Sequence, residues 1–410
     1  MVVTDWQSRG LKISGKGTTI LNRPPSPKAP RVREEPRFLP RFPANFSLEF
    51  ADWVVQHYDA KSAVIDPFCG SGTSLIAAAA HGLDSWGIDF NPAWVVYGRG
   101  RTVTQTSNLS EECNHQVAKL FRHGSLDTES AAELLDRATT LRGGPDRGPR
   151  DLVASALLKA ARMRARPTFG TNYTWPRTHR FSPRLLPRKT VAVQVRWGIR
   201  HAKWIAETWP PHAKRLFRLG DSSQSRSYGE RKFDLVLTSP PYLSRLDYVR
   251  ASFPEIEFMG AIGAAGCEGL RERQIGSLLV SHEDSSRDDL PSKSEFLVKR
   301  IRRHRSKGSQ SYYSKFVRNY LLGIRKTATK LASACNPRAE AWVVIQDSWY
   351  KDLQIRTDVL LEELFGEAGW SVRRKWSFKV PSSLSELAAT THGWRDKSPL
   401  EEHVLRFERT

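Results

Sequence analysis

Short apolar runs alternate with segments of helical pattern along much of the chain. Residues 233–237 read FDLVL, five mostly apolar residues of β-forming type, which predicts a buried central strand of a parallel sheet. Two further apolar runs, at 63–65 and 86–88, flank an alanine-rich helical segment that Thr73 or Ser74 can cap. Strands that alternate with helices in this way predict an α/β fold built on a doubly wound, mostly parallel sheet.

The rest of the chain continues this alternation. Ser47 can cap a helix, and Asn91 followed by Pro92 is typical of a helix start. Apolar residues at helical spacing between 313 and 324 predict one face of a long amphipathic helix. Beyond it we expect a buried strand at 341–345, a helix at 358–365, and a final antiparallel strand pair at 370–380 and 403–409.

Two stretches interrupt the pattern. Residues 104–212 have mostly helical spacing, contain a capping box at Asn108 and Glu111, and carry arginines interleaved with aromatic residues. Such a mixture suits a surface that holds phosphates and stacks bases, and it also suits a helical subdomain with exposed arginines. Residues 261–311 begin rich in glycine and alanine and end in a basic run at 299–309. This run is a candidate for disorder without a nucleic acid and for phosphate contacts through Arg300, Arg302, Arg303 and Arg305.

The predicted domain organisation follows from these interruptions. A catalytic domain is assembled from three separated segments, while two insertions and one terminal arm account for the rest. The arm is rich in arginine, lysine and proline, which predicts an extended conformation. The arm covers 1–41, and the catalytic domain covers 42–103, 213–260 and 312–410. The helical insertion covers 104–212 and is a candidate for target recognition. The second basic insertion covers 261–311.

Composition narrows the class of protein. The 410 residues include 64 lysines and arginines against 43 acidic residues, a net charge of +21, which favours a polyanionic partner such as nucleic acid over a merely solvated basic surface. We find neither an apolar run long enough for a membrane span nor a signal-peptide pattern. The four cysteines are scattered without paired spacing, which argues for a reducing compartment and against a zinc site. We therefore expect a cytoplasmic protein without a metal ion or a membrane partner.

The turn that follows the central strand is stiff and polar. It reads Thr-Ser-Pro-Pro-Tyr at 238–242, and each proline fixes its φ at about −65° and lacks a backbone donor. We expect the Ser239 side chain and the Pro240 carbonyl to point out of the carboxyl edge of the sheet, where open α/β sheets bind ligands. These two acceptors can take both hydrogens of a nucleobase amine, and Tyr242 can stack on the base. The competing interpretation is a plain strand-ending turn with a half-buried tyrosine.

A glycine-bearing loop, DPFCGSGT at 66–73, follows the first predicted strand. Gly70 and Gly72 let the backbone approach a ligand closely. Asp89 closes the strand at 86–88, where a carboxylate can bind both hydroxyls of a ribose. The loop lacks the G-x-G-x-x-G spacing of a nicotinamide-binding loop, and a lone glycine loop is a weak signal.

Three motifs, DPFCGSGT at 66–73, GIDFNP at 87–92 and TSPPY at 238–242, resemble those of the amino-group DNA methyltransferases that use S-adenosylmethionine. The resemblance is close over 42–99 and 217–250 and looser over 312–410. It implies a Rossmann-like methyltransferase core that acts on a base flipped out of duplex DNA. The cofactor-binding residues that it implies are Asp66, Phe68, Gly70, Gly72, Thr73, Asp89 and Asp221, and the catalytic residues are Ser239, Pro240, Pro241 and Tyr242.

The resemblance also bears on the target base. In this family, serine at the first position of the catalytic loop is associated with cytosine, and aspartate or asparagine with adenine. Ser239 thus favours methyl transfer to N4 of cytosine, with N6 of adenine as the alternative. A cytosine-C5 enzyme would need a cysteine after a proline, and the sequence has no Pro-Cys pair.

Two other functions stay open at this point. One is an RNA methyltransferase with the same core, and the other is a binding module that has lost catalysis. The partners that the resemblance implies are double-stranded DNA and, as a further candidate, the cognate nuclease of a restriction-modification pair. It also implies a location at the nucleoid of a bacterial-type cytoplasm.

Overall fold

The computed structural model describes residues 24–27, 36, 38–39, 46–58, 63–140, 148–169, 176–244, 247–264, 267, 269–277, 279, 289–380 and 400–410. Most of the predicted basic arm at 1–41 therefore lies outside the described residues. Within the described ranges, every helix is too short or too polar to cross a bilayer.

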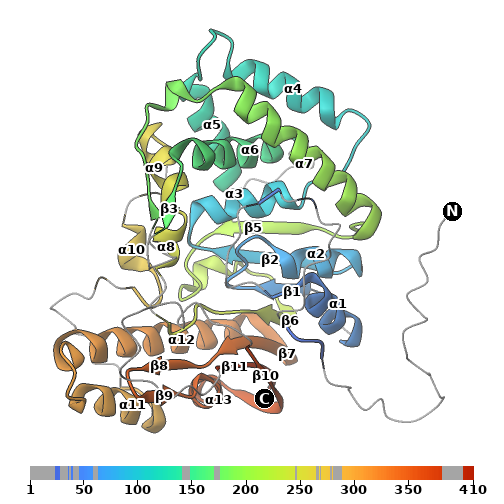
Figure 1. Cartoon of the computed structure of the whole chain (residues 1–410). Helices are drawn as coiled ribbons and strands as arrows, with labels where there is room; N and C mark the ends of the chain where they lie inside the picture. The colour runs from blue at the N-terminus through green and yellow to red at the C-terminus, as the bar shows by residue number, and fades with distance from the viewer. Residues whose placement is uncertain are drawn as a thin grey trace, which may run out of the picture.

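In the described part of the chain, a seven-stranded sheet forms the centre of the molecule, with the order β10-β11-β7-β6-β1-β2-β5 (Figure 1). All its strands run parallel except β11, which is antiparallel to its neighbours β7 and β10. The predicted α/β sheet is therefore confirmed, together with its final antiparallel pair. The strands are β1 (Ala63–Asp66), β2 (Asp84–Asp89), β5 (Arg215–Leu219), β6 (Phe233–Thr238), β7 (Cys335–Gln346), β10 (Trp370–Lys379) and β11 (Glu401–Arg409).

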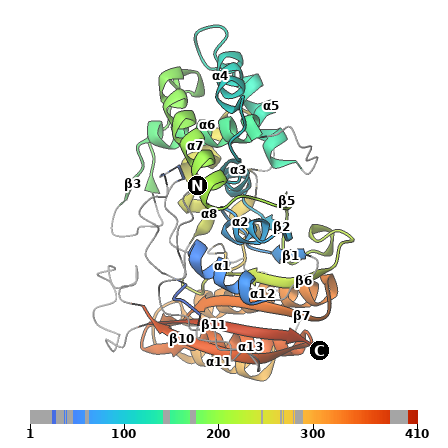
Figure 2. The same ribbon diagram turned by 90° about the vertical axis from the view of Figure 1, so that its right-hand side faces the viewer.

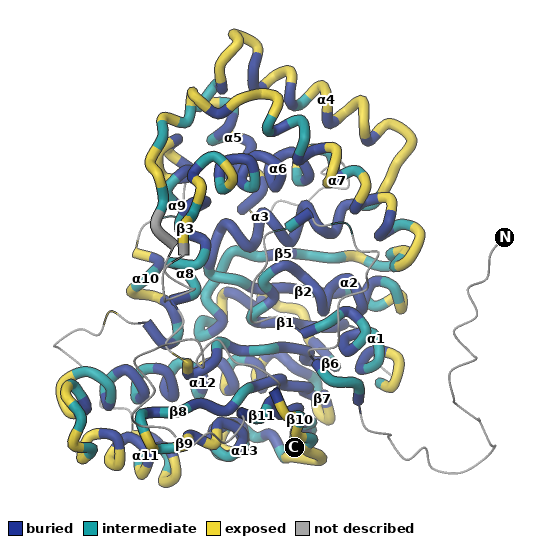
Figure 3. The backbone as a smooth tube through the Cα atoms, viewed as in Figure 1, coloured by how far each residue is buried: buried dark blue, intermediate teal, exposed yellow. Residues whose placement is uncertain are grey.

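Helices cover both faces of this sheet. Successive side chains of a strand point to opposite faces, so Leu235 and Leu237 of β6 pack with α1 and α2, whereas Val236 packs with α12. Figure 3 shows the result, with β1 buried at the centre and exposed backbone mainly along the outer helices. These helices are α1 (Leu48–His57), capped by Ser47 as predicted, α2 (Thr73–Ala80), α12 (Ser314–Ala334) and α13 (Thr357–Glu367).

A helical unit, defined as α4 to α7, lies at one end of the sheet (Figure 2). It consists of α4 (Leu109–Leu120), α5 (Thr128–Thr139), α6 (Gly148–Ala165) and α7 (Arg188–Thr208). Asn108 precedes α4, but its side chain makes no capping hydrogen bond, so the predicted capping box is not formed. Two helices from the sheet side, α3 (Pro92–Arg101) and α9 (Phe253–Ala261), pack against α6 and join the unit to the sheet.

Several short elements complete the described chain. Two-stranded ribbons form from β3 (Thr168–Phe169) with β4 (Pro176–Arg177) and from β8 (Ser348–Tyr350) with β9 (Leu353–Ile355). Two short helices, α8 (Tyr248–Ala251) and α10 (Leu270–Arg273), lie side by side at the edge of the molecule between the helical unit and the sheet (Figure 1).

The basic run predicted at 299–309 is ordered rather than disordered. Its first half forms the end of α11 (Ser292–Arg303), which buries Leu297, Val298 and Ile301 against α12. The many cationic residues between these apolar positions obscure their helical spacing in the sequence. The four predicted phosphate-contacting residues, Arg300, Arg302, Arg303 and Arg305, are all exposed.

Two arginines connect the helical unit to its neighbours, the buried Arg99 to β5 and Arg162 to α9. The Arg99 guanidinium donates to the carbonyls of Arg137 at 3.3 Å, Thr140 at 2.7 Å and Phe217 at 2.9 Å. The Arg162 guanidinium, on α6, donates to the Glu255 carboxylate of α9 at 2.9 Å. Because buried carbonyls need donors, Arg99 fixes the edge strand β5 against the chain that follows α5.

We expect Arg99→Met to lower the free energy of unfolding by about 2–4 kcal/mol, because three carbonyls at a buried joint lose a charged donor. Arg196→Met is the matched control, since Arg196 is exposed on α7. That variant should change the free energy by no more than about 0.5 kcal/mol. Urea denaturation measures both, and equal effects would contradict the structural role given to Arg99.

Candidate active site

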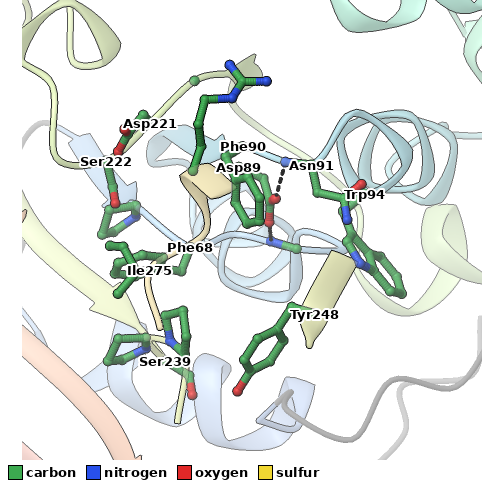
Figure 4. Close-up of a pocket in the computed structure, with 16 residues that line it drawn as sticks. Phe68, Asp89, Phe90, Asn91, Trp94, Asp221, Ser222, Ser239, Tyr248 and Ile275 are labelled. Atoms are coloured by element: carbon green, nitrogen blue, oxygen red, sulfur yellow. Dashed lines mark hydrogen bonds between the residues drawn. The ribbon is translucent and has the colours of Figure 1, made fainter. Parts of the chain in front are cut away.

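A pocket lies at the carboxyl ends of four adjacent parallel strands (Figure 4). Residues that directly follow β1, β2, β5 and β6 all line it, as expected for a ligand site in an open α/β sheet. The lining consists of Pro67, Phe68, Gly70, Asp89, Phe90, Asn91, Trp94, Gly220, Asp221, Ser222, Ser239, Pro240, Pro241, Tyr248, Arg273 and Ile275. The pocket therefore brings together three motifs that are far apart in the sequence.

The predicted site residues fall into two groups in this structure. Seven of them line the pocket: Phe68, Gly70, Asp89, Asp221, Ser239, Pro240 and Pro241. Four others lie behind its wall: Asp66, Gly72, Thr73 and Tyr242. The predicted phosphate-contacting arginines lie elsewhere, at the end of α11 or just beyond it.

The Asp66 side chain lies behind the pocket wall and connects the glycine loop to the Ser-Pro-Pro turn. Its Oδ1 accepts hydrogen bonds from Thr238 Oγ1 at 2.7 Å and from the backbone N–H of Phe68 at 3.0 Å, and its Oδ2 accepts one from Ser74 Oγ at 2.5 Å. Burial raises the pKa of Asp66 from 3.8 to about 6, although the three donors oppose the shift. The side chain thus ties the loop after β1 to the end of β6.

Asp89 holds the loop and the start of α3 in a similar way. Its Oδ2 accepts from the backbone N–H of Gly70 at 3.0 Å, and its Oδ1 accepts from that of Asn91 at 2.9 Å (Figure 4). Burial raises the pKa of Asp89 to about 7, against the effect of these two bonds. Each carboxylate oxygen keeps a lone pair for a further donor from the pocket.

Gly72 meets a tight packing constraint in the glycine loop. Its φ is 82°, and a Cβ added there would lie 2.5 Å from Cζ of Phe217. The neighbouring Thr73 Oγ1 accepts a hydrogen bond from the buried Arg101 at 2.8 Å. Both residues therefore hold the loop without lining the pocket, and their contact with a ligand stays a prediction.

The Ser-Pro-Pro turn is braced by tyrosines. The Pro241 carbonyl accepts from Tyr320 Oη at 2.8 Å, and the backbone N–H of Tyr242 donates to Tyr248 Oη at 2.8 Å. The Tyr242 ring is 9% exposed and packs in the core, with its Oη 3.0 Å from Glu402 Oε1. In this structure the ring is thus turned away from the pocket, and stacking of Tyr242 on a base stays a prediction.

Several lining residues were missed by the sequence analysis. Trp94 and Tyr248 lie on one side of the pocket in Figure 4, opposite Asp221 and Ser239. Trp94 lies one helical turn after the Asn91 cap, so helical spacing from that cap could have indicated it. Tyr248 follows the Ser-Pro-Pro turn by only a few residues, but no local pattern separates its role from that of Tyr242. Two further lining residues, Arg273 and Ile275, come from the second insertion, for which the sequence carried no such signal.

A second group of ionisable side chains lies apart from the pocket. Asp347, Asp358 and His403 are buried, and their nearest polar atoms all lie within 4.8 Å of one another. Arg356 and Lys375 donate to Asp358 at 2.9 and 2.8 Å. Because these two cations offset the two carboxylates, the group is a buried ion network between α13 and β11. That the protein uses no metal ion stays a prediction.

No family model matches this chain, and no curated protein matches it. Similar solved structures include TrmN from Thermus thermophilus, with 8% identity over 88% of this chain and a TM-score of 0.31. Another is the rRNA methyltransferase aviRa from Streptomyces viridochromogenes, with 12% identity over 90% of this chain and 86% of that one, and a TM-score of 0.28. The present chain spans about half of TrmN, 49% of its length. Because identities and TM-scores are low, the fold assignment rests on the strand order of the sheet.

The buried Asp66 carboxyl predicts a pH dependence of stability. Because folding raises its pKa from 3.8 to about 6, the folded state holds a proton that the unfolded state has lost between those values. Protonation of Asp66 therefore stabilises the folded state to its full extent below about pH 3.8, and this stabilisation falls as the pH rises through about 6. Asp66→Asn cannot ionise, so this fall is absent from the variant.

The free energy of unfolding of the wild type, minus that of Asp66→Asn, should be about 2–3 kcal/mol larger near pH 4 than near pH 7. Titration of other carboxyl groups largely cancels in this difference. Urea denaturation at the two pH values measures it. The same difference at both would show that Asp66 titrates normally in the folded protein.

Proposed function

We propose that this protein is an S-adenosylmethionine-dependent DNA methyltransferase that modifies the exocyclic amine of a flipped base, N4 of cytosine. One observation carries the proposal: the glycine loop, Asp89 and the Ser-Pro-Pro turn line the same pocket at the carboxyl edge of the sheet. The three motifs that resemble the amino-group DNA methyltransferases thus contribute to one site.

The side chains of the pocket fit the proposed cofactor. Asp89 has one unused lone pair on each oxygen, which suits the two hydroxyls of a ribose. The Asp221 Oδ1 accepts from Ser223 N and Oγ, while its Oδ2 accepts only from Gln224 and can take a further donor such as an adenine amine. Phe68, Phe90 and Trp94 supply apolar walls. S-adenosylmethionine, when bound, supplies a methyl group on a positively charged sulfur.

The Ser-Pro-Pro turn lines the pocket and carries acceptors that suit an amine. Ser239 Oγ and the Pro240 carbonyl can each accept one hydrogen of that amine, which leaves its nitrogen lone pair aimed at the methyl group. Tyr320 and Tyr248 hold the turn through the Pro241 carbonyl and the Tyr242 N–H. In this scheme the chain contributes positioning and exclusion of water rather than a strong base.

Cytosine is proposed over adenine because serine occupies the first position of the catalytic loop. The direct test is incubation of the purified protein with tritiated S-adenosylmethionine and unmethylated genomic DNA, with total RNA as the competing substrate. Nucleoside mass spectrometry then identifies the product. N4-methylcytosine from DNA is expected. N6-methyladenine would correct the base, and label in RNA alone would replace DNA by RNA as the substrate.

Two exposed basic surfaces support a nucleic-acid partner. One is the group Arg300, Arg302, Arg303 and Arg305 at the end of α11. The other is a stripe along α7, on which exposed cations recur at helical spacing beside Trp197, 39% exposed: Lys189, Arg196, Arg200 and Lys203. Cations beside an exposed aromatic ring suit contact with phosphates and bases. A cognate nuclease and a nucleoid location remain parts of this proposal.

Asp89→Ala should weaken binding of S-adenosylmethionine by about tenfold or more, which corresponds to about 1.4 kcal/mol. The reason is loss of the acceptors for the ribose and of the hydrogen bond that holds Gly70. Asp84→Ala is the matched control, since Asp84 lies on the same strand at its opposite end. Isothermal titration calorimetry measures both affinities, and wild-type affinity in Asp89→Ala would remove the cofactor from this pocket.

Replacement of Arg300, Arg302, Arg303 and Arg305 by alanine should weaken binding to all duplexes alike. If each contacts one phosphate, the slope of log K against log salt concentration should fall by about 3–4. The double change Arg231→Ala, Lys232→Ala, at the amino end of β6, should leave the slope unchanged. Fluorescence anisotropy measures binding, and an altered sequence preference at an unchanged slope would assign base reading to this group instead.

A further inference from the structure

Three polar groups lie in line between the pocket wall and β11. Ser239 Oγ lies 3.5 Å from Tyr242 Oη, and Tyr242 Oη donates to Glu402 Oε1 at 3.0 Å. Glu402, on β11, is 2% exposed. A path of hydroxyl groups therefore runs from the Ser-Pro-Pro turn to a buried carboxylate that the scheme above does not use.

The chemistry of the three groups sets the direction of this path. A hydroxyl has one hydrogen to donate and two lone pairs to accept with, whereas a carboxylate only accepts. Tyr242 must therefore donate its hydrogen to Glu402, so its lone pairs remain for Ser239. Burial and the Glu402 charge raise the pKa of Tyr242 well above its ordinary value, which keeps the phenol protonated.

This direction matters for the proposed reaction. Ser239 can accept a hydrogen from an amine only if its own hydrogen points elsewhere. Tyr242 Oη can accept that hydrogen. The distance of 3.5 Å between Ser239 Oγ and Tyr242 Oη can shorten when a substrate fills the pocket. Without the tyrosine hydroxyl, the Ser239 hydroxyl can rotate and point its own hydrogen at the amine. Two hydrogens then face each other, and Ser239 does not accept a hydrogen bond from the amine.

We propose that Glu402 is a positioning residue, which acts through Tyr242 to orient the Ser239 hydroxyl as an acceptor for the amine of the target base. The inference rests on the proposed function, because it concerns the same amine. It gives the tyrosine of the catalytic loop a role that its buried position allows. It also gives β11 a part in the site.

The test uses Tyr242→Phe and Glu402→Gln. The first removes only the hydroxyl and keeps the packed ring, and the second replaces the carboxylate by an amide that can donate in the wrong direction. Each should slow single-turnover methyl transfer to unmethylated genomic DNA by about tenfold or more, with unchanged affinity for S-adenosylmethionine. The double variant should be no slower than either single one, because both break the same path.

A matched control exists in the same molecule. Tyr97 Oη donates to the buried Glu255 Oε1 at 2.8 Å, but neither residue lines the pocket. Tyr97→Phe therefore removes an equivalent buried hydroxyl and should leave the transfer rate at the wild-type value. Thermal melts of every variant separate slow transfer from partial unfolding.

The link to Ser239 is tested in a Ser239→Ala background. There, Tyr242→Phe and Glu402→Gln should cause no further loss, since the hydroxyl that they orient is gone. Losses that add to that of Ser239→Ala, or wild-type rates in folded Glu402→Gln, would overturn the inference alone. A wild-type protein that methylates neither DNA nor RNA would instead overturn the proposed function, and the inference with it.

Discussion

The site depends on one buried carboxylate, Asp66, at the boundary between two parallel strands. Its oxygens accept hydrogen bonds from the Phe68 N–H, from Ser74 and from Thr238, and thus reach the loop after β1, the first turn of α2 and the end of β6. Thr238 directly precedes the Ser-Pro-Pro turn. The relative position of the glycine loop and that turn is therefore fixed beneath the pocket, by a residue that does not line it.

Such an arrangement has a thermodynamic cost that the local donors offset. Removing a carboxylate from water is unfavourable, and the raised pKa values of Asp66 and Asp89 express that cost. Each group accepts two or three hydrogen bonds in return, which keeps the loop backbone from relaxing. A pocket built in this way is ordered before any ligand arrives, so binding need not supply the free energy to organise it.

The strands and the motif residues were predictable from the sequence because their signals are local. Apolar runs located β1 and β6, and the Asn91-Pro92 pair located the start of α3, where Asn91 indeed caps the helix. The direction of a side chain was not predictable, because it depends on distant partners. Gly72 is required by the ring of Phe217, and Tyr242 is drawn from the pocket by Glu402. Neither partner lies near in sequence.

The same limit applies to the domain boundaries. The segment 213–260, which the sequence predicts as part of the catalytic domain, includes α9, and α9 packs in the core of the helical unit. The domain bounds stay a prediction. Helical spacing indicates that α9 has an apolar face, but it does not indicate which element packs against that face. The second insertion, from 261, likewise supplies α10 and lining residues of the pocket that no pattern had indicated.

This interleaving connects the helical unit to the pocket. Tyr248 begins α8, which runs into α9 at Ser252, and Asn91 of the pocket donates to Ser252 Oγ at 2.8 Å. In its first turn, α9 is held to α6 by the ion pair of the buried Glu255 with Arg162. The aromatic wall of the pocket is thus carried by a segment embedded in the helical unit. A displacement of that unit would act on Tyr248 and on the Asn91 bond, so α8 and α9 link the position of the unit to the shape of the pocket.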